Sequence, residues 1–390
     1  MFETQSNLFD ILAYVLIFLI LYPFVIYPLL LQFISIFLHK KVKSDSNYIV
    51  PVTVLTAAYN EESVIEECVR SVFNSDYPIE KLNMIVGSDG SDDKTIEILE
   101  KLSKEFPNLS YHQLPRGGKN NVLNEILFKA QTDLVIVFDA DLRFEKGTIR
   151  KLVSNFSDQT IGAVLPKFRI EIKDDNTGGS GEKMYQNFEA FLRDRESKIL
   201  SNINPIGACC YRKELLEKIP SNNLCDDLYY MTLTNSKNYR VLYDKEFEVK
   251  EVREKSLGFE FNRRIRLVAG GISTLFHFPS LLSPSGGFRS LFIWSHKLSR
   301  YLAPFFLIVL AILAFLISNQ ILHNLIIYSY LYLILGSVLG YLLEKINITF
   351  VLFKIPLFYL TMVTSFLFGI FRWLKGQQNA VWGREGLHDL

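Results

Sequence analysis

Cysteine is scarce in this sequence, and so is net charge. Four cysteines in 390 residues cannot supply a disulfide framework, and they show neither a CxxC pair nor a Cys/His metal spacing. With 42 Lys and Arg against 41 Asp and Glu, the net charge is +1, so we expect no nucleic-acid partner. The glycine patterns GxxxxGK(S/T) and GxGxxG are also missing, which argues against a P-loop nucleotide hydrolase and a dinucleotide enzyme.

Long apolar runs, by contrast, are present at both ends of the chain. Hydrophobic residues make up 49% of the sequence and charged residues 21%, which indicates a membrane part beside a water-soluble part. Residues 8–38 carry one charge, Asp10, and exceed the length that a ~30 Å hydrocarbon core requires. They must therefore tilt, kink at Pro23 or Pro28, or lie partly in the interface. A cleaved signal peptide fits poorly, because the preceding flank is acidic and no cleavage site follows.

Residues 48–260 alternate strand patterns with helix patterns. Buried strands are predicted at Val52–Thr56, Met84–Gly87, Leu134–Phe138 and Ala163–Leu165, and amphipathic helices at Asn60–Phe73, Asp92–Glu105 and Asn120–Lys129. This alternation predicts an α/β domain whose sheet is mostly parallel, with helices on both faces. Ligands of such sheets bind just after the strands. The turn-rich stretch Asp174–Gly181 is typical of a solvated loop.

The composition changes again beyond residue 256. Leu257–Phe278 and Gly287–Arg300 mix basic with apolar residues, which favours helices in the membrane interface. Three spanning-length segments follow, at roughly Tyr301–Ile317, Ile321–Leu342 and Ile355–Trp373. We divide the chain into a transmembrane helix with its basic flank (1–43), a cytosolic domain (44–256), interfacial helices (257–300) and a transmembrane bundle with the tail (301–390).

Basic residues predict which parts of the chain are cytoplasmic. The cluster His39–Lys43 follows the first apolar run, so the positive-inside rule puts residue 40 onward in the cytoplasm. Three further spans would put the tail outside, whereas Arg372, Lys375 and Arg384 favour the cytoplasm. Either one segment is interfacial or re-entrant, or a span is miscounted, and the sequence leaves that choice open.

Carboxylates follow the predicted strands. Asp139 and Asp141 come directly after Leu134–Phe138, and an Asp-x-Asp strand end suits Mg²⁺ or Mn²⁺, which take oxygen ligands and share them with substrate phosphates. The motif alone is common in solvated loops. Asp226 and Asp227 begin a helix pattern, where favourable interaction with the helix dipole is the ordinary explanation.

Several such motifs occur in one order along the chain. They are Ala58-Tyr-Asn60-Glu61-Glu62, Ser88-Asp89-Gly-Ser-Asp92, Arg116-Gly-Gly-Lys119 with Asn124, Asp139-Ala-Asp141, Gly207, Asp226-Asp227 and Arg263-x-x-Arg266. Together they resemble the membrane-embedded glycosyltransferases of family 2, whose catalytic domain has the Rossmann-like GT-A fold. The resemblance runs from about residue 48 to the tail, and the cellulose and hyaluronan synthases are its best-known branch.

The resemblance implies a role for each matching residue. The nucleotide-sugar would be bound by Ala58, Asn60, Glu61, Glu62, Asp89, Lys119, Asn124, Asp139, Arg263 and Arg266, with Asp89 at the uracil of a UDP-sugar. Asp141, together with Asp139, would hold a divalent cation, Mn²⁺ or Mg²⁺. Asp227 would be the general base, with Asp226 beside it.

The implied function is inverting, metal-dependent transfer of a sugar from a nucleotide-sugar to a saccharide or lipid-linked acceptor, with a UDP-sugar as the expected donor. It would take place at the cytoplasmic face of the cell membrane, in the synthesis of a cell-surface polysaccharide. Ser88 replaces the first Asp of a common Asp-Asp pair, which is a mild departure. Leu267 stands where processive synthases have Trp, which puts processivity in doubt.

Alternatives remain at this stage. One is transfer of a single sugar to a polyprenyl phosphate or a glycolipid. A second is a non-catalytic membrane scaffold that binds sugar nucleotides. A transporter is disfavoured, because the predicted spans hold few charged groups. The oligomeric state cannot be read from the sequence.

Overall fold

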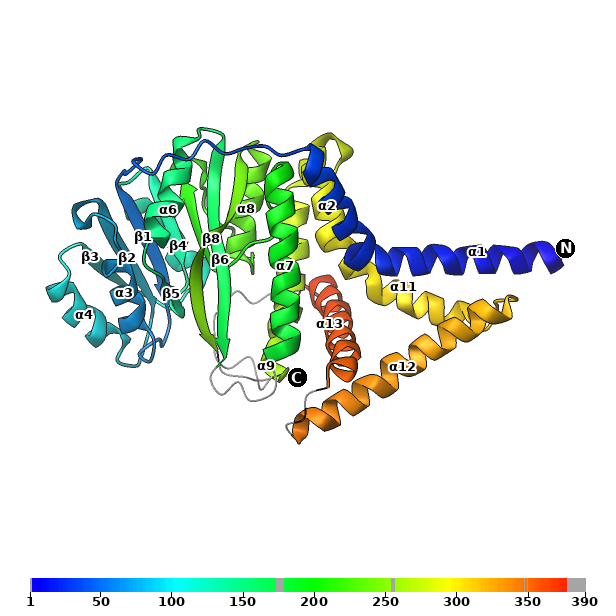
Figure 1. Cartoon of the computed structure of the whole chain (residues 1–390). Coiled ribbons are helices and arrows are strands. Elements are labelled where there is room, and N and C mark those ends of the chain that lie inside the picture. The colour runs from blue at the N-terminus through cyan, green and yellow to red at the C-terminus, as the bar shows by residue number, and fades with distance from the viewer. Residues whose placement is uncertain (1, 173–178, 254–256, 347, 349, 377–390) are drawn as a thin grey trace.

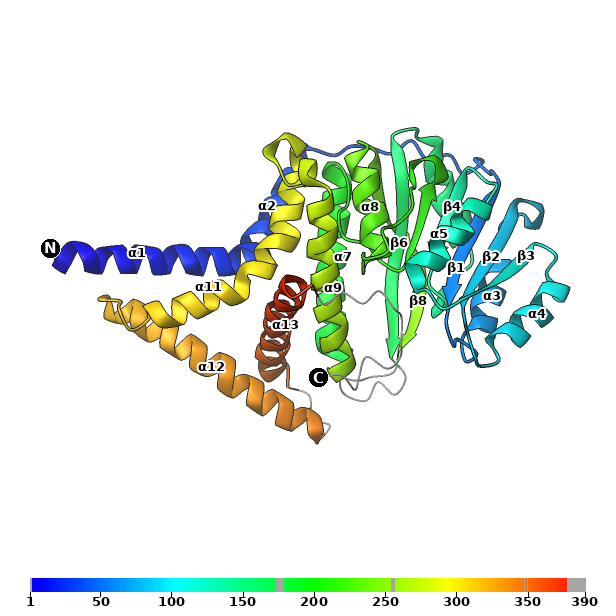
Figure 2. The ribbon, with the colours of Figure 1, turned by 180° about the vertical axis from the view of Figure 1, so that it is seen from behind.

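The computed structural model describes residues 2–172, 179–253, 257–346, 348 and 350–376. A sheet domain lies at one end, and a group of long helices lies at the other (Figures 1 and 2). The strands are β1 (Val52–Ala58), β2 (Leu82–Asp89), β3 (Leu109–Leu114), β4 (Leu134–Phe138), β5 (Leu142–Phe144), β6 (Ile161–Ile172), β7 (Ala208–Arg212) and β8 (Arg240–Arg253).

The helices follow in chain order. They are α1 (Phe2–Leu21), α2 (Tyr27–Phe37), α3 (Ile65–Phe73), α4 (Thr95–Glu105), α5 (Lys119–Lys129), α6 (Thr148–Ser154), α7 (Gly179–Ile199), α8 (Asp226–Ser236), α9 (Leu257–His277), α10 (Phe288–Phe292), α11 (Ser299–Leu313), α12 (Gln320–Lys345) and α13 (Val351–Leu374). Short 3-10 turns are η2 (Ile79–Lys81), η3 (Asn155–Ser157), η4 (Lys213–Leu215), η5 (Pro279–Leu281) and η6 (Pro284–Gly286). Two π-helical segments are η1 (Tyr22–Ile26) and η7 (Ile293–Leu298).

The strands of the described chain form one sheet in the order β3-β2-β1-β4-β7-β6-β8-β5. β3, β2, β1 and β4 are mutually parallel, with Val52 of β1 opposite Leu82 of β2 and Leu134 of β4. All seven residues of β1 are buried, as expected for a strand covered on both faces. β7 is antiparallel to both of its neighbours. The sheet is therefore mixed but mostly parallel on the side where the predicted strands lie.

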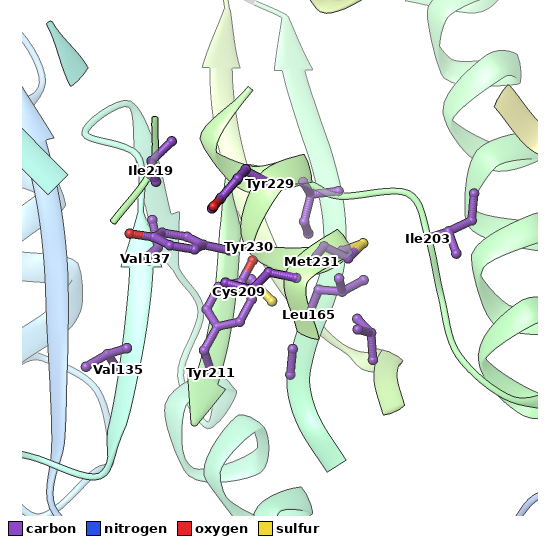
Figure 3. Close-up of a cluster of buried hydrophobic side chains, with 14 of the residues drawn as sticks. Val135, Val137, Leu165, Ile203, Cys209, Tyr211, Ile219, Tyr229, Tyr230 and Met231 are labelled. Atoms are coloured by element: carbon purple, nitrogen blue, oxygen red, sulfur yellow. The ribbon is translucent and has the colours of Figure 1, made fainter. Parts of the chain in front are cut away.

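Helices cover both faces of the sheet. On one face, α8 lies over β4, β7 and β6 and lays Tyr229, Tyr230 and Met231 against them (Figure 3). The rings of Tyr230 and Tyr211 meet edge to face, with centroids 5.7 Å apart. Because this packing fixes α8, it also fixes the two aspartates that begin the helix.

The structure has an element at each position that the sequence patterns predicted, but most of the observed ends differ from the predicted ones. β4 has the predicted bounds, whereas Ala163–Leu165 is the core of the much longer β6. The sequence patterns missed β3, β5, β7 and β8, which are short, polar on one side or antiparallel. Residues 174–178 of the predicted loop lie outside the described residues, and α7 begins at Gly179, so the end of that loop is helical instead.

The described residues contain four helices that are long and apolar enough to cross a membrane: Leu8–Phe37, Phe288–Leu313, Gln320–Lys345 and Val351–Leu374. Their outward side chains are apolar, as lipid contact requires. The first helix bends sharply at η1, which contains Pro23, so α1 and α2 run in different directions (Figure 1). A kink at Pro23 is one of the three options that the length of this run left open.

The C-terminal helices fold back on themselves. The helix that begins at Phe288 continues through Arg300 to Leu313 without a break, so no helix end falls at the predicted boundary at residue 300. α11 lies beside α1, α12 returns toward the sheet domain, and α13 stands between α12 and α9 (Figures 1 and 2). Glycines allow this packing: a Cβ on Gly340 of α12 would lie 2.3 Å from the carbonyl oxygen of Phe353.

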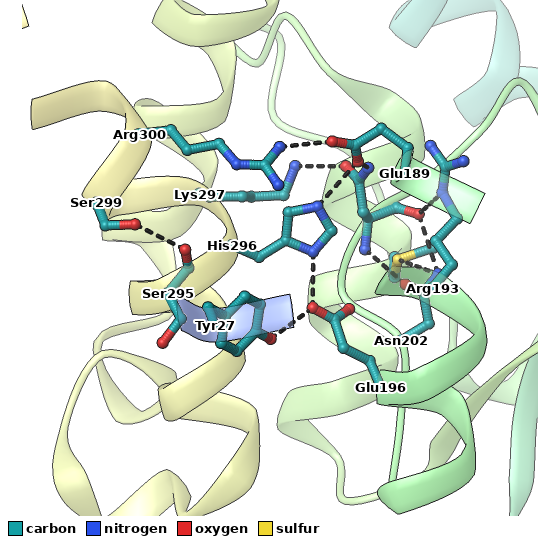
Figure 4. Close-up of polar contacts among 12 residues, drawn as sticks. Tyr27, Glu189, Arg193, Glu196, Asn202, Ser295, His296, Lys297, Ser299 and Arg300 are labelled. Atoms are coloured by element: carbon teal, nitrogen blue, oxygen red, sulfur yellow. Dashed lines mark hydrogen bonds and ion pairs between the residues drawn. The ribbon is translucent and has the colours of Figure 1, made fainter. Parts of the chain in front are cut away.

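A buried polar network joins the sheet domain to the membrane helices (Figure 4). His296 of η7 lies between two glutamates of α7, with Nδ1 2.7 Å from Glu196 Oε1 and Nε2 2.9 Å from Glu189 Oε2. The Tyr27 hydroxyl of α2 donates to Glu196, and Arg300 of α11 donates to Glu189. Each imidazole nitrogen of His296 therefore faces a carboxylate oxygen. We call these five residues the junction cluster.

Candidate active site

Three loops meet at one edge of the sheet, because β2, β1 and β4 are parallel neighbours and end at the same side. The loops follow Ala58, Asp89 and Phe138, and they carry five of the predicted site residues: Asn60, Glu61, Glu62, Asp139 and Asp141. Ala58 itself is fully buried in the core, so only its backbone faces the edge. The architecture therefore gathers acidic side chains from three separate parts of the sequence.

Lys119, the first residue of α5, ties two of these carboxylates together. Its Nζ lies 2.7 Å from Asp139 Oδ1 and 3.0 Å from Asp226 Oδ2. Burial alone would lower the pKa of Lys119, but the charges of Asp139, Asp226 and Asp227 raise it well above its usual value. The lysine therefore stays charged and links the end of β4 to the start of α8.

Asp227 lies beside this pair, and the pKa of its carboxyl group is raised. Burial and the neighbouring charge of Asp226 together raise the pKa of Asp227 to about 6, against the opposing effect of Lys119. Its Oδ1 accepts a 2.7 Å hydrogen bond from the backbone N–H of Leu228. A carboxylate with a pKa this close to neutrality is suited to take up a proton.

Gly207 completes the pocket around these aspartates. A Cβ at this position would lie 2.2 Å from Asp139 Oδ2, so only glycine allows the strand-end carboxylate to sit here. The Gly207 carbonyl also accepts a 3.0 Å hydrogen bond from the Asp139 N–H. Between Gly207, Asp139, Asp226 and Asp227 lies a cavity of about 10 Å³, which is about the size of one water.

Asp89 is fully buried at the end of β2. Its carboxylate accepts hydrogen bonds from the N–H groups of Gly117 (2.7 Å) and Gly118 (2.9 Å) and pairs with Arg116 at 2.8 Å. The Arg116 guanidinium lies over the ring of Tyr59, 3.3 Å from its centroid. Asp89 therefore holds the Arg116–Lys119 turn against the β1 loop, and Arg116 with Tyr59 forms a flat surface at this edge.

The loops after β1 and β2 are locked to each other. Asn60 has a positive φ of 52°, which asparagine tolerates better than most residues. Its side chain donates to Asp92 Oδ1 at 2.6 Å and accepts from the Asp92 N–H at 3.0 Å. Glu62 accepts from the Lys94 N–H, and the Glu61 N–H donates to Thr95 Oγ1. The backbone of these loops is therefore held in one conformation.

Three predicted residues lie apart from the aspartates. Asn124 makes two hydrogen bonds with the backbone of Ile219, at 2.9 and 2.8 Å, so it holds the segment that leads to Asp226. Arg263 and Arg266 lie on α9, and Arg266 is exposed to solvent. The Arg266 charge acts on the Cys225 thiol, one residue before Asp226.

Other residues that position the base were not singled out from the sequence. Asn223 holds the turn before α8: its carbonyl accepts from Asn120 (2.6 Å), its Nδ2 donates to Thr274 of α9 (2.8 Å), and its Oδ1 accepts from the Cys225 N–H (2.8 Å). α9 comes this close because of Gly270, where a Cβ would lie 2.6 Å from Cys225 Sγ. Asn120 directly follows the motif Arg116-Gly-Gly-Lys119, and this position could have identified it as a site residue. Nothing in the sequence indicates that Asn223 contacts Thr274.

The residues at the end of β4 fit a divalent cation of a particular kind. Asp139 and Asp141 provide two carboxylates, and the described residues contain no group of three or more His, Cys, Asp or Glu side chains that could hold a metal alone. Mg²⁺ typically binds to one or two carboxylates and completes its shell with water and substrate phosphates. The donor set therefore fits a cation that shares its ligands with a bound diphosphate.

Comparison with known proteins places this arrangement in a family. Residues 53–220 match the model of glycosyl transferase family 2, and this range includes the three loops and Gly207. Residues 53–220 form a glycosyl transferase family 2 domain. The family assignment agrees with the resemblance that the ordered motifs carry.

The family 2 domain is similar to curated proteins that are larger than the aligned region. It is 36% identical over 138 residues to the beta-monoglucosyldiacylglycerol synthase of Synechocystis sp., covering 34% of this chain and 29% of that protein. The chain is 25% identical over 244 residues to the poly-beta-1,6-N-acetyl-D-glucosamine synthase of Staphylococcus aureus, covering 61% of this chain and 58% of that protein. The alignment therefore spans about a third of the first relative and just over half of the second.

Among solved structures, a mannosyltransferase from Pyrobaculum calidifontis in complex with GDP-Man and Mn²⁺ is similar over nearly the whole chain. The TM-score is 0.72, with 94% of this chain and 99% of that chain covered at 20% identity. The likeness shows the fold alone, which is a sheet domain of GT-A architecture flanked by apolar helices. The predicted fold class is confirmed.

Proposed function

We propose that this protein is an inverting glycosyltransferase that uses a nucleotide-sugar donor at a membrane surface. The single observation that carries the proposal is the cluster of Asp139, Lys119, Asp226 and Asp227 at the strand edge of a family 2 domain. Within it, Asp227 has a pKa raised to about 6 by burial and by Asp226. A buried carboxylate of this kind, beside a second acid at a ligand-binding edge, is expected of a general base.

In the proposed reaction, the acceptor hydroxyl gives its proton to Asp227 while its oxygen attacks the anomeric carbon. The bond from that carbon to the diphosphate oxygen breaks on the opposite face, so the configuration inverts in a single displacement. Lys119 forms ion pairs with Asp226 and Asp139. Because Lys119 is engaged in this way, Asp227 forms no strong ion pair with it, and the Asp227 carboxylate stays basic enough to accept a proton.

The donor would lie along the loops after β1, β2 and β4. The Tyr59–Arg116 surface and buried Asp89 offer a platform for the nucleoside, and we propose a UDP-sugar as donor. Asp139 and Asp141 would hold Mn²⁺ or Mg²⁺, which would neutralise charge on the leaving diphosphate. The structural relative was solved with GDP-Man and Mn²⁺, so GDP-sugars belong in the test beside UDP-sugars.

The membrane helices suggest where the reaction takes place. We propose that α1, α11 and α12 cross the bilayer and that α13 lies along its surface beside α9, on the side of the sheet domain. This arrangement puts the basic segment His39–Lys43, the sheet domain and Lys375 on one side, which the positive-inside rule makes the cytoplasm. It also removes the conflict between three further spans and a basic tail.

The test is sugar transfer by the full-length protein purified in detergent. UDP-glucose, UDP-N-acetylglucosamine, UDP-galactose and GDP-mannose are each supplied with a bacterial lipid extract, with Mn²⁺, Mg²⁺ or EDTA. We expect metal-dependent release of nucleoside diphosphate from one donor, and loss of release in Asp227→Asn. Nucleotide binding without release under any condition would favour a non-catalytic scaffold, and full activity in Asp227→Asn would remove the proposed base.

A further inference from the structure

The helix Phe288–Leu313 contains a lysine, Lys297, that lies close to the proposed active site. Lys297 lies in η7, between the membrane helices and the sheet domain, and its Nζ donates to Asn204 Oδ1 at 2.9 Å. Its charge acts on Asp227 and on Cys225, so the ammonium lies near the turn that holds the proposed base. Figure 4 shows Lys297 beside Arg300, both reaching from the membrane helix toward α7.

Lys297 has few partners within the protein for a charged group. An ammonium has three hydrogen-bond donors, and Asn204 accepts from only one of them. No carboxylate of the described chain comes within ion-pair distance of Lys297. Glu189, the nearest acid by charge, is already engaged by Arg300, His296 and the Asn204 amide. Lys297 is half-buried, so its two remaining donors are open to water or to an anion that takes the place of water.

A hydroxyl group lies one helical turn further on the same face. Tyr301 follows Lys297 at i+4, and residues at this spacing are neighbours on a helix surface. The Tyr301 oxygen lies 2.9 Å from the place that a Cβ on Gly271 would occupy, and it lies near Cys225. In the part of the chain that the structure describes, this hydroxyl has no hydrogen-bond partner. Arg266 of α9 adds a second cation near Cys225.

These groups form an incomplete anion site next to the proposed base. We propose that Lys297 and Tyr301 bind a phosphate group carried by the acceptor, and that the acceptor is a membrane lipid. The inference rests on the proposed function, because it names the acceptor class of that same site. The lipid source follows from the helix: beyond Tyr301, α11 exposes Ile308, Val309 and Ile312, so an acyl or prenyl chain lying against it would bring its head group to Lys297.

Binding can be tested without any catalytic step. Farnesyl phosphate, farnesol and inorganic phosphate are titrated separately into the full-length protein in detergent, and the unfolding temperature is measured. We expect a saturable rise with farnesyl phosphate and little change with farnesol. Inorganic phosphate should bind much more weakly, because it has no chain to lie along the helix. An equal response to farnesol, or to inorganic phosphate, would overturn the proposal.

Variants locate the site. Lys297→Gln should weaken farnesyl phosphate binding about tenfold or more, and Tyr301→Phe by a smaller factor, since hydrogen bonds to charged groups are worth more than neutral ones. Lys297→Arg should retain binding, which separates loss of charge from loss of fold. Lys345→Gln, at the far end of α12, makes the same charge change and should bind normally. Unchanged affinity in Lys297→Gln would contradict the proposal.

The two proposals fail in different ways. If wild-type protein binds farnesyl phosphate through Lys297 and transfers no sugar from any donor, the proposed function is wrong and the anion site stands. If it transfers sugar to a neutral acceptor and Lys297→Gln transfers equally well, the anion site is wrong and the proposed function stands. Nucleotide affinity, measured in each variant, should be unchanged by substitutions at Lys297 and Tyr301.

Discussion

At the edge of the sheet, three carboxylates, those of Asp139, Asp226 and Asp227, lie around the single ammonium of Lys119. In the junction cluster, Glu189 faces both Arg300 and His296. Burial, together with the excess of negative charge, raises the pKa of Asp227 to about 6. At the junction, burial alone would raise the pKa of Glu189, but Arg300 and His296 hold it well below its usual value. The aspartates at the edge of the sheet are therefore suited to take up a proton, whereas the junction cluster stabilises the packing of the helices.

The largest effect should come from removing the base. Asp227→Asn keeps the shape of the side chain and removes its ability to accept a proton, so we expect transfer to fall by about 10²- to 10⁴-fold. Nucleotide affinity and unfolding temperature should change little, because the substitution relieves repulsion with Asp226. Initial rates and calorimetric binding on the same preparation measure both. A loss of nucleotide affinity equal to the loss of rate would contradict the assignment.

The junction cluster should respond in the opposite way. Glu189→Gln leaves Arg300 and His296 without their shared carboxylate, and breaking a buried ion pair typically costs about 3–5 kcal/mol. We expect a clearly lower unfolding temperature in detergent. Arg70→Gln, which removes exposed ion pairs with Glu66 and Glu105, is the control and should have little effect. Equal stability of the two variants would contradict the role given to the junction.

The two clusters also differ in how far the sequence predicts them. Asp139 follows a strand of the parallel part of the sheet, so periodicity alone puts it at the ligand-binding edge. Asp227 begins a helix, and only the resemblance to family 2 motifs connected it with the site. Glu189 and His296 are 107 residues apart in the sequence. The sequence alone does not distinguish Glu189 from the other acidic residues of its helix. Their pairing depends on how α7 packs against η7, which is decided by tertiary contacts.

The same distinction explains other successes and failures. β4 was predicted with its observed bounds because it is a short apolar run between polar turns. The bridging of two aspartates by Lys119 depends on the direction of a long side chain, which no pattern encodes. The bend at η1 and the continuation of the helix through Arg300 depend on packing around the junction, so the sequence left the bend open and put a boundary where the helix continues.

An intermediate effect is expected at Gly207. In Gly207→Ala, the new methyl group would overlap Asp139 Oδ2, so the carboxylate or the strand must move. Overpacking of this kind costs about 1–3 kcal/mol, and here it should also weaken metal-dependent nucleotide binding. Gly162→Ala, where a Cβ would lie 2.6 Å from Tyr239 Cβ in the core, should lower stability without weakening nucleotide binding. If both variants bind nucleotide normally, Gly207 has no special part in the site.

The smallest effect is a shift in pH dependence. Asp227 must be ionised to accept a proton, so the transfer rate should rise with pH through about 6 and level off above it. The pKa of this carboxyl group is raised in the folded protein, so ionising it lowers the free energy of unfolding as pH rises from about 4 to about 6. Lys119→Met removes a cation that lowers the Asp227 pKa, so the midpoint of the rate profile should move to higher pH. A shift to lower pH would contradict the electrostatic account.

The most direct test of the central claim compares Asp227→Asn with Glu189→Gln in one experiment. Unfolding temperature, nucleotide affinity and transfer per folded molecule are measured for both, with wild type alongside. We predict that Asp227→Asn keeps its stability and nucleotide affinity and loses transfer, whereas Glu189→Gln loses stability and keeps transfer per folded molecule. The opposite pattern, with a stable but inactive Glu189→Gln and an active Asp227→Asn, would show that the base lies at the junction and not at the edge of the sheet.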